Sequence, residues 1–246
     1  MTRTVLLLGC AALLAAACSG TPAASTPTAS AAPAAACTHP YFPLALGAHW
    51  TYSDGRRWTV TALSGDADQA TVSVLLTISN DSRQHTSQWK CGNGQIMGGV
   101  LATLYGLSPA PGGGLIPGGQ TLVNTSGQFL PEAQRLQPNF AWTQTFSEQL
   151  QISSGGTTAN TIERYAVTGT EPVVFNGREY EALRLAGQRT VDEAQDSNGQ
   201  VAHVVVSDVA FELVLARGVG LISLTVREAG SGQTGALNLT EYALRP

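Results

Sequence analysis

The strongest constraint on the fold is a period of two in the apolar residues, which begins at Trp50 and recurs toward the C-terminus. The clearest segment is QATVSVLLTIS, residues 69–79, where alternate positions from Ala70 to Ile78 are apolar and those between them are polar except Leu75. Such alternation is typical of a strand with one buried face. No segment shows the 3.6-residue period of a helix of about ten residues or more, so the chain is predicted to be mainly β.

Turn-forming residues divide the chain into further strands. Similar alternation, with breaks, occurs in residues 58–62, 140–152, 162–168, 211–215, 222–227 and 237–244. Turn signals lie between strands at Asp54-Gly55, Asn80-Asp81, Asn93-Gly94, residues 153–160 and Asn176-Gly177. We therefore predict an antiparallel sheet or barrel of about ten strands with little helix.

The first hairpin allows two registers. A two-residue loop at Asp54-Gly55 would pair Trp50 with Thr59 and place Trp50 and Trp58 on opposite faces. A three-residue loop that also includes Ser53 sets Trp50 opposite Trp58 and buries both rings, so we expect this register.

The second hairpin is predicted from a two-residue turn at Asn80-Asp81. This turn sets Val72 opposite Trp89 and Ala70 opposite Cys91. The core face of the later strand then carries His85, Trp89 and Cys91.

The N-terminus has the pattern of a secretory signal over residues 1–17. Arg3 precedes an apolar and small-residue run from Val5 to Ala17. This run is shorter than the roughly 20 residues that span a bilayer, so it predicts a cleaved signal.

The signal ends in Leu14-Ala15-Ala16-Ala17-Cys18, which resembles the lipobox of bacterial lipoproteins, with Ala15 where Leu is favoured. The resemblance implies cleavage before Cys18 and lipidation of its sulfur. Cys10 is a rival acceptor, but cleavage there would leave too short an apolar segment. The alternative is an ordinary secretory signal followed by a coincidental cysteine.

Residues 18–36 follow as a linker, composed after Cys18 only of Ala, Ser, Thr, Pro and Gly. Such a segment cannot bury a core, and we expect a disordered tether with a reach of roughly 25 Å. The folded domain is then predicted at 37–246. Two or more acyl chains would hold it stably on a membrane.

The remaining cysteines and the charge are informative. In an exported protein Cys37 and Cys91 are predicted to form a disulfide, with two unpaired thiols as the alternative. Loss of Arg3 with the signal leaves 12 basic and 17 acidic residues, a net charge of −5. No block of one sign occurs, so binding to nucleic acid is not expected.

Two segments interrupt the strand pattern. Residues 98–127 contain PAPGGGLIPGGQ, and a Gly/Pro-rich loop is predicted at about 106–127, either a lid over a cavity or a disordered insertion. Residues 130–139, LPEAQRLQPN, can hold one helical turn between Pro131 and Pro138.

Three blocks resemble a group of bacterial envelope lipoproteins. The first, YFPLALGAHWTY at 41–52, fits a signature written Y-F/Y-P-L-x-x-G-x-x-W-x-Y; the others are EPVVFNGREYEALRL at 171–185 and ARGVGLI at 216–222. The resemblance implies a single curved antiparallel sheet that forms an open or half β-barrel around an apolar concavity, as in lipoprotein-trafficking carriers. It also implies an extracytoplasmic, lipid-anchored location, in the outer membrane where one exists. It implies no activity.

No catalytic residue, metal ligand or cofactor is predicted. The sequence has no Gly-x-Ser-x-Gly, His-Glu-x-x-His, Cys-x-x-Cys or phosphate-binding Gly-Lys-Ser/Thr motif, and its four histidines are far apart. The densest carboxylates are expected to form a solvated face on strands and turns: Glu163, Glu171, Glu179, Glu181, Asp192 and Glu193. We therefore do not expect an enzyme.

The four tryptophans are the candidates for lining a ligand cavity, with plain core packing as the alternative: Trp50, Trp58, Trp89 and Trp142. Two hypotheses follow. The protein binds an apolar small molecule or lipid in a concave sheet, or it is packed solid and binds an envelope protein through a sheet edge or the long loop. The second predicts an exposed apolar patch.

Overall fold

The protein consists mainly of β-strands in a computed structural model that describes residues 33–79, 81–101, 120–152, 155–197 and 200–244. Two short 3-10 helices occur in these ranges, η1 (Pro33–Cys37) and η2 (Ala133–Arg135). The strands are β1 (Thr38–His39), β2 (Phe42–Pro43), β3 (His49–Tyr52), β4 (Arg56–Gly65), β5 (Gln69–Ile78), β6 (Asp81–Gly92), β7 (Gln95–Met97), β8 (Gln120–Ser126), β9 (Ala141–Ile152), β10 (Gly155–Phe175), β11 (Arg178–Ser197), β12 (Gln200–Ala216), β13 (Gly220–Glu228) and β14 (Thr234–Ala243).

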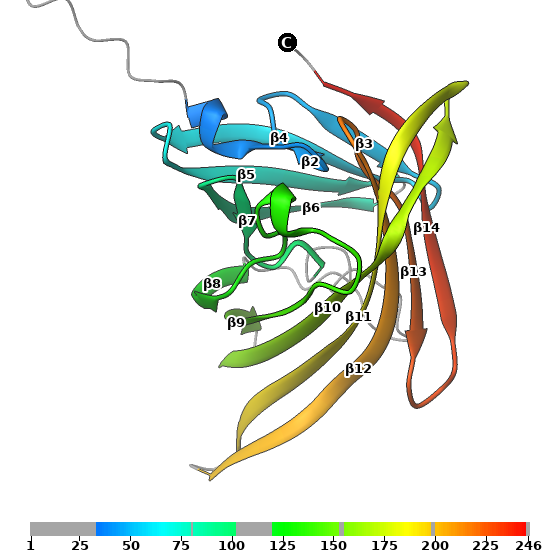
Figure 1. The fold of residues 1–246 in the computed structure, drawn as a ribbon. Coiled ribbons are helices and arrows are strands. Elements are labelled where there is room, and N and C mark those ends of the chain that lie inside the picture. The colour runs from blue at the N-terminus through cyan, green and yellow to red at the C-terminus, as the bar shows by residue number, and fades with distance from the viewer. Residues whose placement is uncertain (1–32, 80, 102–119, 153–154, 198–199, 245–246) are drawn as a thin grey trace, which may run out of the picture.

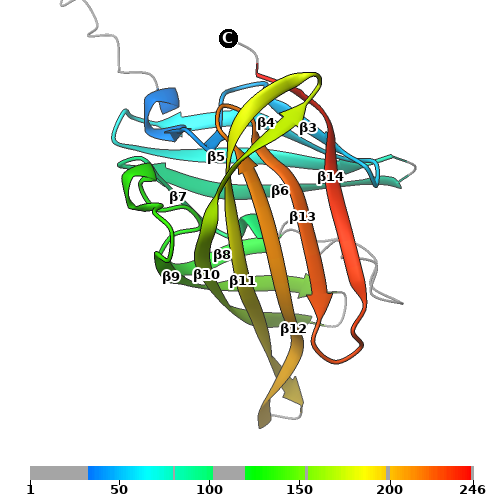
Figure 2. The ribbon, with the colours of Figure 1, turned by 45° about the vertical axis from the view of Figure 1, so that its right-hand side comes forward.

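Twelve of these strands form one antiparallel sheet in the order β7-β6-β5-β4-β3-β14-β13-β12-β11-β10-β9-β8. The sheet bends sharply, so that β4 to β6 lie across from β8 to β10 and the long strands β11 to β14 form the wall between them (Figures 1 and 2). The end strands β7 and β8 are not paired with each other, and the sheet stays open. The predicted mainly β fold with a curved antiparallel sheet is confirmed, with twelve strands where about ten were expected.

The first hairpin has the predicted register. Trp50 pairs with Trp58, and the Gly55 amide donates to the Tyr52 carbonyl at 3.0 Å. Gly55 has a φ of 83°, the left-handed conformation that a three-residue loop requires of its last residue.

The second hairpin has the predicted pairs but a different turn. Val72 pairs with Trp89 and Ala70 with Cys91, as expected. A register shift follows Thr77, so that Ile78 pairs with Asp81 and the predicted two-residue turn at Asn80-Asp81 is wrong. Asn80 lies outside the described residues. His85 is paired through its backbone with Leu76, and its side chain is likewise not described.

Strand β9 has nearly its predicted bounds, but β10 and β11 are longer than the sequence indicated. Residues 155–160, predicted as part of a turn, belong to β10 and pair with β9 from Ile152 backward. The β10–β11 turn is as expected: Phe175 pairs with Arg178, and Asn176 and Gly177 have φ values of 49° and 73°. Two positive φ values are what a two-residue type I′ turn demands.

The disulfide between Cys37 and Cys91 forms, with a Cα–Cα distance of 5.1 Å, as predicted. It fixes the start of the domain to β6. Ala36 in η1 is also buried, only 4% exposed. Ala36 thus packs against the core directly next to the predicted start of the domain at Cys37.

The long loop is shorter than predicted. Residues 120–126, expected in the Gly/Pro-rich loop at 106–127, form β8 and pair with β9. Its apolar residues, Leu122 and Val123, are adjacent among polar ones, so no period of two marked the strand. Residues 102–119, on which the lid hypothesis rests, lie outside the described residues, as do the predicted signal, Cys18 and most of the tether.

The segment between β8 and β9 fills the gap between the ends of the sheet. Leu130 forms an isolated bridge with Ile96 of β7, with amide-to-carbonyl distances of 2.9 and 3.1 Å. The helical turn predicted in 130–139 is present as η2. Phe129 and Leu130, which precede η2 in this segment, are buried.

Candidate functional site

The three sequence blocks that carry the lipoprotein resemblance meet at one place. The Gly218 amide donates to the Pro40 carbonyl at 2.7 Å, and the Trp50 indole N–H donates to the Val219 carbonyl at 2.6 Å. Gly220, with a φ of 109°, lies so close to Trp50 that a Cβ there would be 3.1 Å from the indole nitrogen. These contacts give the blocks a role in holding the chain start against β13.

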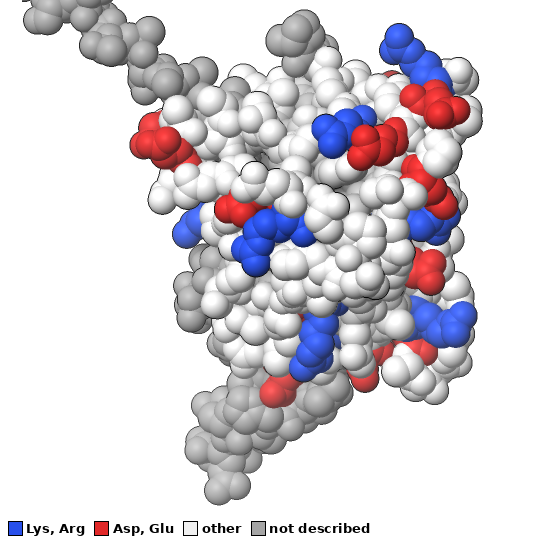
Figure 3. Space-filling model, in the orientation of Figure 1, with Lys and Arg blue, Asp and Glu red and all other residues white. Residues whose placement is uncertain are grey.

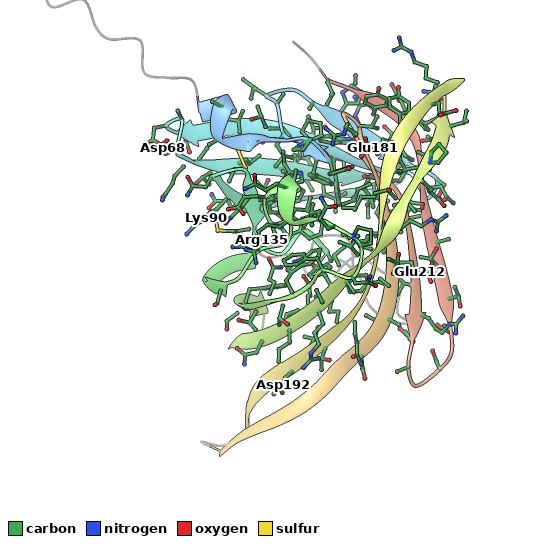
Figure 4. All side chains as sticks on the ribbon, viewed as in Figure 1. Asp68, Lys90, Arg135, Glu181, Asp192 and Glu212 are labelled. Carbon is green, nitrogen blue, oxygen red and sulfur yellow. A yellow bond between two sulfur atoms is a disulfide. The ribbon has the colours of Figure 1, made fainter. Side chains whose placement is uncertain are left out.

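A polar cluster covers this junction on the surface. The Tyr41 hydroxyl donates to Glu181 Oε1 at 2.5 Å, Arg217 Nε lies 3.2 Å from Glu181 Oε2, and the Arg217 guanidinium lies over the Tyr41 ring. Burial and the Glu181 carboxylate raise the pKa of Tyr41. The side chains of Glu181 and Arg217 are half exposed, and Glu181 is labelled in Figure 4. Figure 3, in the same orientation, shows acidic and basic side chains next to one another at several places on this face. The cluster therefore joins three blocks and leaves no acidic or basic group free for chemistry.

Three of the four candidate tryptophans belong to a packed aromatic core. Trp50, Trp58 and Trp89 are each at most 1% exposed, and Phe42 lies between them at centroid distances of 5.9 to 6.4 Å. A ligand could reach these rings only by separating them. Core packing, the alternative reading of their sequence pattern, describes all three.

Trp142 is different, because it is half-buried and lies nearer the end strands. Its ring stacks on Tyr165 at 5.0 Å and on Phe140 at 5.5 Å, and its indole N–H donates to the Gln128 carbonyl at 3.0 Å. Trp142 thus covers one face of the Tyr165 ring. The aromatic core ends at Tyr165, and a row of polar side chains follows it along β10.

The polar row crosses β9, β10 and β11 on the inner face of the sheet. Gln144 pairs with Glu163, and Glu163 with Arg189, so the three side chains lie side by side. Gln144 and Glu163 are 0% exposed and Arg189 is 6% exposed. Charged side chains are almost never this buried unless they are paired, and a buried ion pair contributes little net stability.

Glu163 is the centre of this row. Its Oε2 accepts hydrogen bonds from the Tyr165 hydroxyl at 2.5 Å and from Gln144 Nε2 at 2.9 Å. Its Oε1 lies 3.7 Å from Arg189 Nε. Burial raises the pKa of Glu163, and Arg189 and the two hydrogen bonds only partly offset this. Burial and Glu163 raise the pKa of Tyr165 well above its ordinary value.

The expectation that the densest carboxylates form a solvated face is wrong for Glu163. Tyr165 and Val167 are core residues two and four positions along β10, and strand alternation puts Glu163 on the same face. That parity is the signal in the sequence. Glu171, Glu179 and Glu181 are at least partly exposed; Glu171 pairs with Arg184, which lowers its pKa. Asp192 is half-buried, and the Glu193 side chain is not described.

A second apolar zone lies beyond the polar row. Thr161 pairs with Phe146 on one side and with Val191 on the other, and Ala159 is the next inward position of β10. All four side chains are at most 7% exposed. Ala159 and Val191 form a cluster separate from the main core. The inner face is therefore apolar, then polar, then apolar again along β10.

The histidines do not gather into a site in the part of the chain that the structure describes. His39 is buried: its Nδ1 accepts from the Tyr41 amide at 3.2 Å and its Nε2 is 3.0 Å from the Pro131 carbonyl. Burial lowers the pKa of His39 to about 4, so the ring is neutral at pH 7. His49 is 3.7 Å from Glu241. Among the described residues no three His, Cys, Asp or Glu side chains are placed to hold a metal ion.

Comparison with known proteins is informative about the fold. No protein-family model matches the sequence, and no curated protein matches it. Its fold is similar to that of a predicted exported protein with a YmcC-like fold from Bacteroides fragilis, with a TM-score of 0.54 and 12% identity over 82% of this chain and 98% of that one. A predicted lipoprotein from Parabacteroides distasonis gives a TM-score of 0.55 and 10% identity over the same shares. The chain thus shares an open antiparallel-sheet fold with these two proteins.

The described part of the chain contains no helix with the length and apolar character needed to cross a membrane.

Proposed function

We propose that this protein is a lipid-anchored component of the cell envelope that binds an amphipathic ligand on the inner face of β9, β10 and β11. The anchor is the lipobox cysteine, Cys18, and the tether carries the domain. The likeness of the fold to a predicted exported protein and a predicted lipoprotein agrees with this location.

The observation that carries the proposal is the polar row of Gln144, Glu163 and Arg189 between two apolar zones. A sheet that served only as a scaffold would be more stable with apolar residues at these inward positions, because desolvation of two charges offsets most of their attraction. Buried ionisable groups with shifted pKa values cluster at functional sites. A ligand with an apolar body against Phe146 and a polar group facing Glu163 would match both the second apolar zone and the polar row.

The test is native mass spectrometry of the full chain, purified from membranes in dodecylmaltoside. We expect a co-purified species of defined mass in the wild type. Ala159→Phe fills the second apolar zone and should remove that species, while Thr168→Phe, on the outer face of the same strand, should retain it. A wild-type protein that stays free of ligand after incubation with a lipid extract would contradict the proposal.

A second function, binding of an envelope protein, is favoured by one observation. Val174 is 73% exposed near the tip of the β10–β11 hairpin, which Figure 1 places at the same end as the C-terminus. Leu46 is 58% exposed. Exposed aliphatic side chains of this kind occur at protein interfaces, although scattered ones are also normal. A partner that cross-links at position 174 and is lost in Val174→Asp would support this function.

A further inference from the structure

We propose that the ligand bound at the polar row presents uncharged hydrogen-bond donors, hydroxyl or amide N–H groups, to the inner face of β9 and β10. This inference rests on the proposed function and specifies the chemistry of the ligand's polar end.

Three buried oxygens on this face have no hydrogen-bond donor among the described residues: Gln144 Oε1, Glu163 Oε1 and Thr161 Oγ1. Their side chains are at most 1% exposed. Glu163 Oε1 faces Arg189 Nε at 3.7 Å, which is an ion-pair distance but too long for a hydrogen bond. A buried polar atom without a partner raises the free energy of the folded state by about as much as a hydrogen bond is worth. A ligand group that donates to all three oxygens would recover this free energy on binding.

The three oxygens lie close together on one face. Gln144 is directly opposite Glu163 in the β9–β10 pair, and Thr161 is the next inward residue of β10. Two residues along a strand span about 7 Å. A head with two adjacent donors, such as a diol or a primary amide, has the dimensions to reach this set.

The hydrogen bonds already present make the free oxygens of Gln144 and Glu163 acceptors, and the Thr161 hydroxyl oxygen can accept as well. Gln144 Nε2 donates to both the Gly98 carbonyl and Glu163 Oε2, so its amide nitrogen is engaged and Oε1 is the free end. Glu163 Oε2 also accepts a hydrogen bond from the Tyr165 hydroxyl. An anionic head group would carry no donor for the free oxygens and would lie beside the Glu163 carboxylate. A cationic head group would lie beside the Arg189 guanidinium. Neutral donors avoid both costs.

A rival set of unpartnered polar atoms is less suited to a ligand. Trp58 Nε1, Trp89 Nε1 and the Tyr52 hydroxyl also have no hydrogen-bond partner among the described residues. However, these rings are in edge-to-face contact at 5.5 Å, where an N–H can point at a neighbouring ring. A neighbouring ring face can thus partner these donors, whereas the carbonyl and carboxylate oxygens of the polar row have no such substitute.

The test uses ligands that share an octanoyl chain and differ only at the head. They are 1-monooctanoylglycerol, with two hydroxyl donors; methyl octanoate, with none; and octanoate, an anion. Each is titrated into the full chain in dodecylmaltoside, and binding is followed by native mass spectrometry. We expect the glycerol ester to bind at least about tenfold more tightly than the methyl ester, with octanoate weakest, since one such bond is worth about a factor of ten.

Thr161→Val supplies the matched variant, because valine has the shape of threonine without the hydroxyl. It should raise the unfolding temperature of the ligand-free protein by about 2–4 °C, since an unsatisfied buried group is removed, and it should weaken the glycerol ester several-fold. Thr161→Ser, which keeps the hydroxyl, should retain binding. Thr168→Val, at an exposed outward position, removes only the solvent-exposed hydrogen bond to the Arg184 carbonyl; it should leave ligand affinity unchanged and should not raise the unfolding temperature.

The outcomes separate the two proposals. Equal binding of the glycerol and methyl esters would overturn the donor inference while the ligand-binding function stood. An unchanged affinity in Thr161→Val would also overturn it. Failure of every octanoyl ligand to bind would overturn both.

Discussion

The two halves of the curved sheet bury their inner faces in different ways. The half formed by β3 to β7 is filled by aromatic rings around Phe42 and closed by the Cys37–Cys91 disulfide. The half formed by β9 to β11 places a glutamate, an arginine and a glutamine at the equivalent depth. Packed aromatic rings stabilise the folded state. Buried charged and amide side chains stabilise it less than apolar residues would at the same positions. The difference teaches that one continuous sheet can be packed for stability in one half and keep buried polar side chains in the other.

The largest expected effect tests whether the aromatic half carries the stability. Phe42→Ala should lower the free energy of unfolding by about 4–5 kcal/mol, the upper range for removal of a buried phenylalanine, because four aromatic rings lose a shared neighbour. Urea unfolding followed by circular dichroism measures it. Phe146→Ala, in the second apolar zone, is the matched change in the other half. Equal losses for the two variants would show that the halves do not differ.

Removal of the disulfide should have the next largest effect. Its cysteines are 54 residues apart, and closing such a loop stabilises by about 4 kcal/mol in the chain-entropy model. The Cys37→Ala, Cys91→Ala double variant should show this loss in urea unfolding, relative to the oxidised wild type. The reduced wild type serves as a second reference. A loss below about 1 kcal/mol would indicate that hydrogen bonds of the chain start, such as the one between Gly218 and Pro40, hold it without the bridge.

Acid should affect two buried groups, His39 beside the aromatic half and Glu163 in the polar row, with opposite sign. His39 has a pKa of about 4 in the folded state against 6.5 when unfolded, so the unfolded chain takes up the proton more readily. Its contribution is complete above pH 6.5 and falls by about 3 kcal/mol as the pH drops to 4. Glu163 has a raised pKa in the folded state, so the folded chain takes up the proton first, and acidification through that pKa stabilises it.

The two contributions can be separated by substitution. The acid-induced loss of stability should become smaller in His39→Gln, with carboxylates of lowered pKa such as Glu171 still contributing to it, and larger in Glu163→Gln, measured by urea unfolding between pH 7 and pH 4. If neither variant changes the slope of stability against pH, the buried environments of the two groups are not as described.

The smallest effect concerns the surface cluster that joins the three blocks. Tyr41→Phe removes the hydroxyl that donates to Glu181 and should cost about 1 kcal/mol, because Glu181 is half exposed and solvent replaces part of the bond. The loss is read from the midpoint of urea unfolding. Glu181→Gln, which keeps an acceptor, should cost less than Tyr41→Phe. A loss above about 3 kcal/mol would mean that the cluster, and not the aromatic core, fixes the chain start.

The sequence by itself determined much of the fold. Alternation identified the strand QATVSVLLTIS, the turn residues Gly55 and Gly177 set two hairpins, and compartment and spacing paired Cys37 with Cys91. These features are local, or depend on a register that a turn fixes, so they can be read along the chain. The extra length of β10 and the strand β8 were missed, because Gly- and Ser-rich segments look like turns until a neighbouring strand pairs with them.

Only the tertiary structure decided which side chains share the inner face of the sheet. It places Trp50, Trp58 and Trp89 around Phe42, a residue from a two-residue strand. These three candidate ligand-binding residues are therefore part of the packed core. It also placed Glu163 against Gln144 and Arg189, which come from segments 19 and 26 residues away. Burial and pairing across strands are non-local, and a glutamate in a sequence reads as solvated until the neighbouring strands show which face it shares.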